Sequence, residues 1–233
     1  MKKLLNSLLI LLLLSFQNSF GQTFEISEIF ETSSVILNKL NENDYSQAEG
    51  SPYLDKNFKS GKLIFENSKT YNVLARLNVG SQKFEIKKDS NSEPNLIEID
   101  NSVKVEMNGI IYKSHSINLN GQEIIAVLED CIELENISLY YFPKKVIKMP
   151  VDTGGANAPS SGSSRAPKPK WADASEFVVK IEGMWHIIPK SYKKLVAKNI
   201  FDQKLLKKYK KANKLNLKKR ESLIELVSYF NSI

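Results

Sequence analysis

Between residues 61 and 142 the chain contains short runs in which apolar and polar residues alternate, which is the pattern of half-buried β-strands. Val103, Val105 and Met107 alternate with Lys104 and Glu106, so one side of this run is apolar and the other polar. Comparable runs, rich in Ile, Val, Leu, Phe and Tyr, are Gly61–Glu66, Lys69–Val79, Gln82–Lys87, Leu96–Asp100, Val103–Met107, Ile110–Lys113, Glu123–Glu129 and Ile132–Phe142.

Turn-forming residues separate these runs. Asn108-Gly109 stands between two of them and is the strongest hairpin signal, with Asn120-Gly121 next. Asn-Gly supplies the positive φ angles that two-residue hairpin turns require. Short strands at even spacing predict an antiparallel meander, a sandwich or a partly closed barrel.

After residue 170 the pattern becomes one hairpin followed by helices. Glu176–Ile181 and Met184–Ile188 flank Glu182-Gly183, which predicts a further hairpin. The period then changes to that of amphipathic helices. We expect helices over Lys193–Lys198, Gln203–Asn213 and Leu217–Phe230, capped by Ser191, Asp202 and Asn216. The predicted fold class is α+β, with a β-rich N-terminal domain, a linker, and a small C-terminal region of hairpin and helices.

The N-terminus has the features of an export signal. Lys2 and Lys3 precede the apolar run Leu8–Leu14, and the small residues Ser19 and Gly21 follow at signal-peptidase spacing. The apolar run is too short to cross about 30 Å of hydrocarbon comfortably as an anchor. We therefore expect an exported protein that is periplasmic, associated with the outer membrane, or secreted.

A change of composition marks a boundary within the chain. From residue 150 to 170, 11 of 21 residues are Gly, Pro or Ser, which predicts a flexible linker. The expected organisation is a signal peptide at 1–21, a β-rich domain at 22–149, the linker at 150–170, and a basic hairpin-plus-helices domain at 171–233.

Charge is distributed unevenly across that boundary. Residues 22–164 hold 14 Lys and Arg against 20 Asp and Glu, whereas residues 166–233 hold 16 against 6. The net charge of +7 therefore averages an acidic body and a basic tail. The candidate anion- or partner-binding residues lie in the second predicted helix and directly after it: Lys204, Lys207, Lys208, Lys210, Lys211 and Lys214. Clustered ammonium groups attract anions, although a solvated face that only maintains solubility is the alternative.

The sequence offers no established catalytic or metal motif. Asp152-Thr153-Gly154 resembles an aspartic-protease triplet, but it opens the linker and no second triplet occurs, so we interpret it as a turn. His115 and His186 have no other ligand types at metal-site spacing. We expect no cofactor, no metal site and no enzymatic activity.

Two other features of the β-rich segment are open to alternatives. The acidic cluster Glu129, Asp130, Glu133 and Glu135 is interpreted as a solvated outer face, with a calcium site as the minor alternative. Cys131 is the only cysteine, so no internal disulfide forms. We interpret it as a small core residue, with a reactive thiol or an intermolecular bridge as the alternatives.

Two segments of the sequence resemble an uncharacterised family of secreted or periplasmic Bacteroidota proteins. The first is Gly50-Ser51-Pro52-Tyr53-Leu54-Asp55 with Phe58, Gly61, Tyr71 and Arg76-Leu77-Asn78. The second runs from Lys210 to Lys219 and continues with Glu221 and Leu223–Asn231. The resemblance implies an envelope location and assigns no activity or site residue.

The leading functional hypothesis is a non-catalytic envelope protein that binds an anionic envelope component or an envelope protein through its basic helices. The alternatives are a structural subunit of an envelope assembly and, less favoured, an enzyme of unrecognised type. Because the protein is expected to be exported, we predict no nucleic acid among its partners. Peripheral contact with a membrane fits the hypothesis, and no later stretch is apolar enough to span one.

Overall fold

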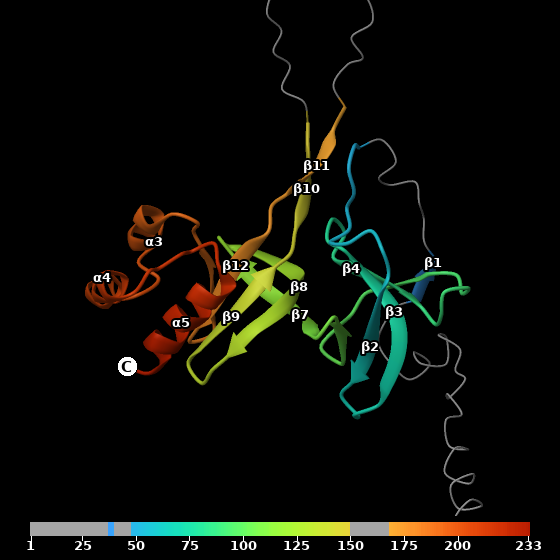
Figure 1. The fold of residues 1–233 in the computed structure, drawn as a ribbon, viewed down its shortest axis with the longest axis horizontal. Helices are drawn as coiled ribbons and strands as arrows, with labels where there is room; N and C mark the ends of the chain where they lie inside the picture. The colour runs from blue at the N-terminus through green and yellow to red at the C-terminus, as the bar shows by residue number, and fades with distance from the viewer. Residues whose placement is uncertain (1–36, 40–47, 150–167) are drawn as a thin grey trace, which may run out of the picture.

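The computed structural model of the chain describes residues 37–39, 48–149 and 168–233 (Figure 1). The strands are β1 (Leu37–Lys39), β2 (Lys59–Phe65), β3 (Thr70–Asn78), β4 (Lys83–Lys87), β5 (Asn95–Ile97), β6 (Val103–Met107), β7 (Ile110–Leu119), β8 (Gln122–Glu133), β9 (Ile137–Phe142), β10 (Lys145–Lys148), β11 (Lys170–Asp173), β12 (Glu176–Ile181) and β13 (Met184–Ile188). The helices are α3 (Tyr192–Lys198), α4 (Gln203–Ala212) and α5 (Arg220–Asn231). The predicted signal peptide, the Asp152-Thr153-Gly154 triplet and most of the predicted linker lie outside the described residues.

Eleven strands form one antiparallel sheet in the order β1-β5-β4-β3-β2-β6-β7-β8-β9-β12-β13, and β10 pairs with β11 in a separate ribbon. The α+β class with a β-rich first part is thereby confirmed, and the sheet does not close into a barrel. The predicted hairpin turns are confirmed as well. Asn108 and Gly109 have φ angles of 52° and 76°, and Asn120 and Gly121 have 56° and 82°. Both pairs occupy the left-handed region that the turn requires.

Strands β2–β6 enclose the first hydrophobic core. The apolar side of β6 behaves as the alternation predicts, because Val103, Val105 and Met107 are buried while Lys104 is exposed. Phe84 and Ile86 of β4 are fully buried in the same cluster. Each fully buried side chain of this size contributes about 1.5–3 kcal/mol of hydrophobic stabilisation.

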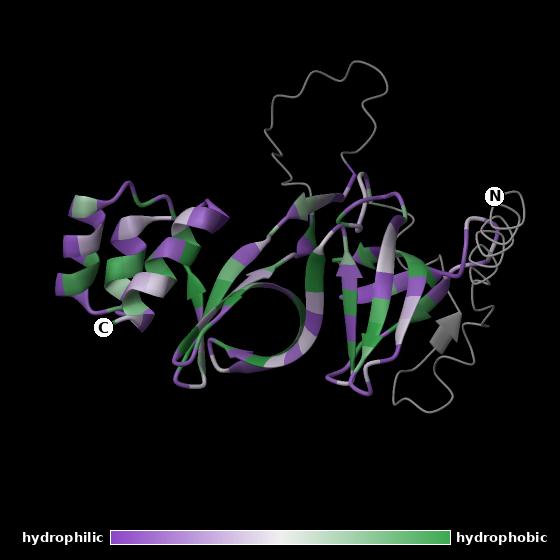
Figure 2. Cartoon of the chain, turned by 60° about the horizontal axis from the view of Figure 1, so that its bottom comes forward, coloured by the Kyte–Doolittle hydropathy of each residue, from purple (hydrophilic) through white to green (hydrophobic). Residues whose placement is uncertain are grey.

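The other half of the sheet has a separate core on each face. On β9 and β12, Leu139 and Val179 pack against the helices, whereas Tyr140 and Val178 belong to a cluster on the opposite face. Neighbouring strand residues point to opposite sides, so both faces of these two strands are covered. Figure 2 shows the central strands curving into an open arc, with the helices at one end of the molecule.

The three helices follow the predicted order, with corrected boundaries. Asp202 caps α4 as predicted, accepting a hydrogen bond from the backbone N–H of Leu205 at 2.8 Å. Ser191 stands at the start of α3 but makes no side-chain capping bond. The prediction that Asn216 caps the last helix is wrong, because α5 begins at Arg220 after Lys219. Asn216 instead accepts from the backbone N–H of Lys218, and this bond stabilises a turn before the helix.

Several strand predictions differ from the structure; for example, β7 runs to Leu119, beyond the predicted end at Lys113. The predicted strand Ile132–Phe142 is interrupted, since β8 ends at Glu133 and β9 begins at Ile137. The predicted C-terminal hairpin forms, but β12 pairs along its whole length with β9. The hairpin therefore extends the sheet of the preceding segment, a relationship that the expected division at residues 150–170 did not foresee. Pairing between strands distant in sequence depends on the tertiary fold rather than on local pattern.

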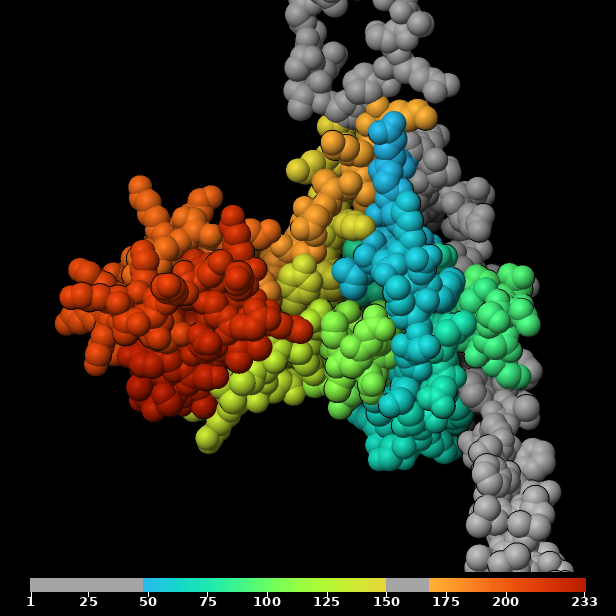
Figure 3. All heavy atoms as spheres, viewed as in Figure 1, coloured from blue at the N-terminus to red at the C-terminus, as the bar shows by residue number. Residues whose placement is uncertain are grey.

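Residues 49–54, here called the strap, connect the ribbon to the first half of the sheet. The backbone N–H of Trp171 donates to the carbonyl of Glu49 at 2.9 Å, and that of Val79 donates to Pro52 at 3.0 Å. Lys145 of β10 also donates to the carbonyl of Ser51 at 3.0 Å. Figure 3 shows this part of the chain, in blue, lying beside the yellow and orange ribbon. The strap thus bonds to Val79 on one side and, on the other, to Trp171, far later in the sequence.

Candidate anion-binding site

The positive charge of the C-terminal part is confined to the helices and their loops. Residues 189–233 hold 13 Lys and Arg against three acidic residues, Asp202, Glu221 and Glu225. Residues 168–188 hold three of each sign and are neutral. The helices form a lobe at the end of the molecule away from β1 (Figures 1 and 3). The basic helices thus lie at one end of the molecule, where α5 packs on β8 and β9.

Helix α4 orients most of the predicted lysines. Leu206 and Tyr209 are buried against the other helices. Helical spacing places the lysine row, defined as Lys204, Lys207, Lys208 and Lys211, on the opposite side of α4. All four are exposed. Ala212 was expected with the apolar residues but is exposed.

The remaining two predicted lysines, Lys210 and Lys214, line a different feature. They border a hollow of about 500 Å³ between the end of β13, the end of α4 and the start of α5. The lysines of this lysine hollow are Lys190, Lys210, Lys214, Lys218 and Lys219. None of the residues lining it is acidic. The structure therefore places four of the six predicted lysines in an outward row and two in a concave site, which also contains three lysines that were not predicted, Lys190, Lys218 and Lys219.

Side chains around the hollow hold parts of it in place. The Nζ of Lys210 lies 3.7 Å from the centre of the Tyr192 ring, a cation–π contact. The backbone N–H of Asn216 donates to the Oγ of Ser222 at 2.9 Å, and that of Lys219 donates to the carbonyl of Asn216 at 3.1 Å. These bonds fix the loop that joins α4 to α5.

The lysines of the row and the hollow have no carboxylate partner among the residues that the structure describes. Within residues 48–149 and 168–233, none of the nine lies within 4 Å of a carboxylate oxygen. Lys190 acts on a carboxylate at longer range. The pKa of Asp173 is lowered mainly by the hydrogen bond from the Ser175 hydroxyl and, to a smaller extent, by the positive charge of Lys190. The backbone N–H groups at the start of α5 contribute positive potential beside the hollow, offset in part by Glu221 in the first turn. The arrangement favours anions.

The acidic cluster on β8 is more buried than its sequence indicates. The prediction of a solvated face is wrong for Glu129, which is 7% exposed and pairs with Arg220 of α5. Asp130 pairs with Lys113 at 2.6 Å, and Glu133 contacts the same ammonium at 3.1 Å. In the part of the chain that the structure describes, no group of three His, Cys, Asp or Glu is placed to hold a metal ion.

The histidines lie apart, on different strands. His115 on β7 packs among aromatic rings, 5.0 Å from Tyr140 and 5.6 Å from Trp185 between ring centres. His186 on β13 is half-buried opposite Val179. Cys131 is partly buried beside Arg220, whose Nε and Nη2 lie 3.3 Å from its sulfur.

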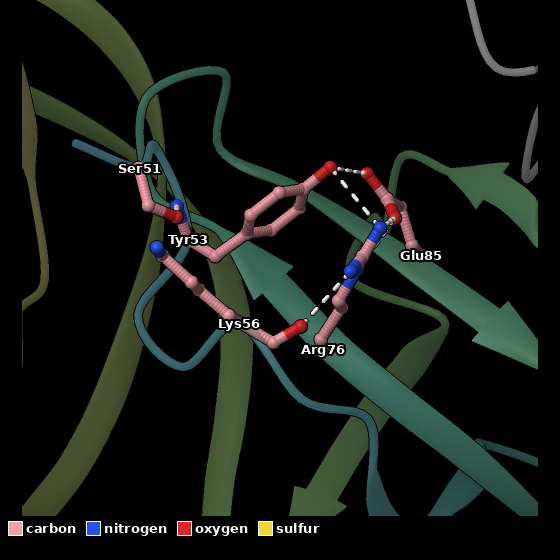
Figure 4. Close-up of polar contacts among 5 residues, drawn as sticks. All are labelled: Ser51, Tyr53, Lys56, Arg76 and Glu85. Atoms are coloured by element: carbon pink, nitrogen blue, oxygen red, sulfur yellow. Dashed lines mark hydrogen bonds and ion pairs between the residues drawn. The ribbon is translucent and has the colours of Figure 1, made fainter. Parts of the chain in front are cut away.

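A buried polar cluster explains part of the N-terminal sequence pattern (Figure 4). The Nε of Arg76 donates to Glu85 at 2.7 Å, and the Tyr53 hydroxyl donates to the same carboxylate at 2.6 Å. Arg76 also donates to the carbonyl of Lys56 at 2.9 Å. Tyr53 belongs to the Gly50–Asp55 segment that begins this pattern, and Arg76 belongs to the Arg76-Leu77-Asn78 segment that ends it. The two segments therefore meet in space. Sequence reasoning missed Glu85, because the alternation Phe84-Glu85-Ile86 is typical of a strand whose polar residue faces solvent.

Comparisons with protein-family models, with curated proteins and with solved structures gave no match. Among the described residues, no helix combines the length and the apolar character needed to cross a membrane.

Proposed function

We propose that this is an exported, non-catalytic envelope protein whose basic helical lobe binds an anionic envelope component. The observation that carries the proposal is the lysine row, four exposed lysines on one side of α4 without a carboxylate partner among the described residues. Ammonium groups that are not neutralised within the protein create a field that attracts anions from solution. Anionic lipids and phosphate-bearing lipids at an envelope surface provide such groups.

The distribution of charge also orients the protein. Residues 48–149 hold 13 Lys and Arg against 14 Asp and Glu and are close to neutral, whereas the basic helical lobe lies at the far end of the molecule from β1. An anionic surface therefore attracts the lobe more strongly than residues 48–149, so the helices face that surface. Docking of the lysines onto acidic residues of the same chain would neutralise this charge. Among the described residues, no ion pair joins the row to a carboxylate, which supports an external partner.

The test measures co-sedimentation of the mature chain, residues 22–233, with vesicles that contain anionic lipid. We expect binding at about 50 mM salt and release by about 300 mM, because the Debye length shortens as salt rises. Replacing the four lysines of the row by Gln should abolish most of the binding. Substitution is preferable to truncation at Ser164, since truncation would remove β12 and leave the edge of β9 unpaired.

The matched control replaces four exposed lysines of the β-rich part, Lys56, Lys69, Lys104 and Lys148, by Gln. This variant has the same net charge as the row variant and should sediment like the wild-type protein. If both variants lose binding equally, net charge rather than the basic helical lobe is responsible. If the wild-type protein does not bind at low salt, the proposal fails.

A further inference from the structure

The lysine hollow differs from the lysine row in shape and in the groups that it gathers. The row is an exposed helix side, whereas the hollow is concave and collects side chains from the β13–α3 connection, α4 and the start of α5. We propose that the lysine hollow is a discrete binding site for a compact ligand carrying at least two phosphate groups. The inference rests on the proposed function, because it assumes that the ligand is an anion. It specifies that this anion carries at least two phosphate groups and binds in the lysine hollow.

The number of charges favours more than one phosphate. Five ammonium groups surround the hollow, and no acidic residue lies in its lining. A phosphate monoester carries about −1.5 to −2 at neutral pH, so two such groups offset most of this charge while one leaves most of it unbalanced. The volume of about 500 Å³ also lies within the range of small-molecule sites and far exceeds a single phosphate ion.

The hollow supplies hydrogen-bond donors besides ammonium groups. Ser222 accepts from the backbone of Asn216, which leaves its own hydroxyl proton available for a ligand oxygen. Lys218, Lys219 and Ser222 line the hollow where α5 begins. The free N–H groups of a helix start favour phosphate oxygens, and here they reinforce the five lysines.

Part of the site is organised before a ligand arrives. Lys210 is held over the Tyr192 ring, and the α4–α5 loop is fixed by bonds through Asn216. Leu217 of the same loop is buried, which anchors it to the helical core. A preorganised site loses less conformational entropy on binding than flexible surface lysines do. The hollow should therefore bind a small diphosphate more tightly than the row binds it.

The test titrates the full mature chain with inorganic pyrophosphate and, separately, with inorganic phosphate, by calorimetry at a constant ionic strength of about 150 mM. We expect one pyrophosphate per chain, bound at least about tenfold more tightly than phosphate. Lys214→Gln with Lys218→Gln should weaken pyrophosphate binding about tenfold or more, through the loss of charge-assisted hydrogen bonds. These two lysines are exposed, and neither caps a helix nor contacts Tyr192.

The matched control is Lys207→Gln with Lys211→Gln in the lysine row, which removes the same charge and should change the affinity by less than about twofold. Circular dichroism and thermal unfolding confirm that both variants are folded. Equal weakening in both variants would show a diffuse field rather than a site and would overturn the inference. Equal affinity for phosphate and pyrophosphate, or no binding of either, would overturn it as well.

A vesicle experiment separates this inference from the proposed function and identifies the source of the ligand. If the wild-type chain binds vesicles in a salt-sensitive way but does not bind pyrophosphate, the inference is wrong and the proposed function stands. If it binds pyrophosphate but not vesicles, the proposed function is wrong and the hollow remains a site for a soluble diphosphate. If the chain binds both pyrophosphate and vesicles, it is mixed with vesicles that contain a lipid with a diphosphorylated headgroup, and pyrophosphate is added as a competitor. Release of the protein from these vesicles by pyrophosphate supports the headgroup as the ligand. Continued binding to the vesicles supports a free diphosphate.

Discussion

Arg76 on β3 donates its Nε–H to the carboxylate of Glu85 on β4 at 2.7 Å, although the Glu85 side chain is fully buried. The Tyr53 hydroxyl donates to the second carboxylate oxygen, so both oxygens have a partner. Burial of a carboxylate is tolerated only when it is paired and hydrogen-bonded. Because Tyr53 belongs to the strap, this buried charge connects the strap to β3 and β4, on the side of the sheet opposite the first core.

Replacing Glu85 by Ala should therefore strongly destabilise the protein. We expect the free energy of unfolding to fall by about 3–5 kcal/mol, since Arg76 would lose its partner in a largely dry environment. Urea denaturation measures the change. Glu98→Ala, which removes the exposed partner of Lys83, is the control and should cost about 1 kcal/mol or less. Equal costs for the two variants would contradict the structural role assigned to Glu85.

Gly80 should not tolerate a side chain, because it lies against the ring of Trp171. A Cβ at this position would be 2.6 Å from Cη2 and 2.8 Å from Cζ3 of that ring. We expect Gly80→Ala to lower the free energy of unfolding by about 1–3 kcal/mol through overpacking. In a Trp171→Phe background, which lacks those two atoms, the same substitution should cost clearly less. An undiminished cost in that background would show that the contact with Trp171 is not the cause.

His115 should make stability depend on pH. Burial, with a smaller contribution from Lys113, lowers the pKa of His115 to about 4. Between pH 6.5 and 4 the unfolded chain binds more protons at this residue than the folded one, so stability falls as pH falls through that window. The expected loss is about 1–2 kcal/mol, allowing for partial exposure.

Other groups facing His115 add to or oppose this effect. Glu133 and Lys180 lie near the ring, and the raised pKa of Asp130, which burial causes, gives a slope of opposite sign just above pH 3.8. Urea denaturation at several pH values between 4.5 and 7.5 measures the slope. His115→Gln should flatten it, and His186→Gln should not. An unchanged slope in His115→Gln would assign the pH dependence to other groups.

Cys131 should be unreactive in the folded protein. Burial, together with the nearby charge of Asp130, raises the pKa of its thiol to about 12, so little thiolate is present at pH 8. We expect a thiol reagent to modify it about a hundredfold more slowly in the folded chain than in urea. A cysteine introduced at the exposed Ser232 serves as the reactive reference. Similar rates at the two positions would support a reactive Cys131.

Local patterns in the sequence predicted local structure well, and the reason is physical. The φ angles required at Asn108-Gly109 and the period-two alternation of Val103–Met107 depend on neighbouring residues only. The start of α5 was misplaced because Asn216 has the chemistry of a helix cap but uses it in the preceding turn. A capping residue identifies a nearby helix start without specifying which turn it stabilises.

The candidate site was predictable only in part. The sequence alone determined that positive charge collects after residue 189 and that Lys204, Lys207, Lys208 and Lys211 share one side of a helix, because a helical period fixes neighbours along one element. Tertiary structure alone decided that Lys190 joins Lys210 and Lys218 around one hollow, and that Glu85 meets Tyr53 in the interior. Those groups are brought together by the packing of separate elements, and long-range packing leaves no periodic trace in the chain.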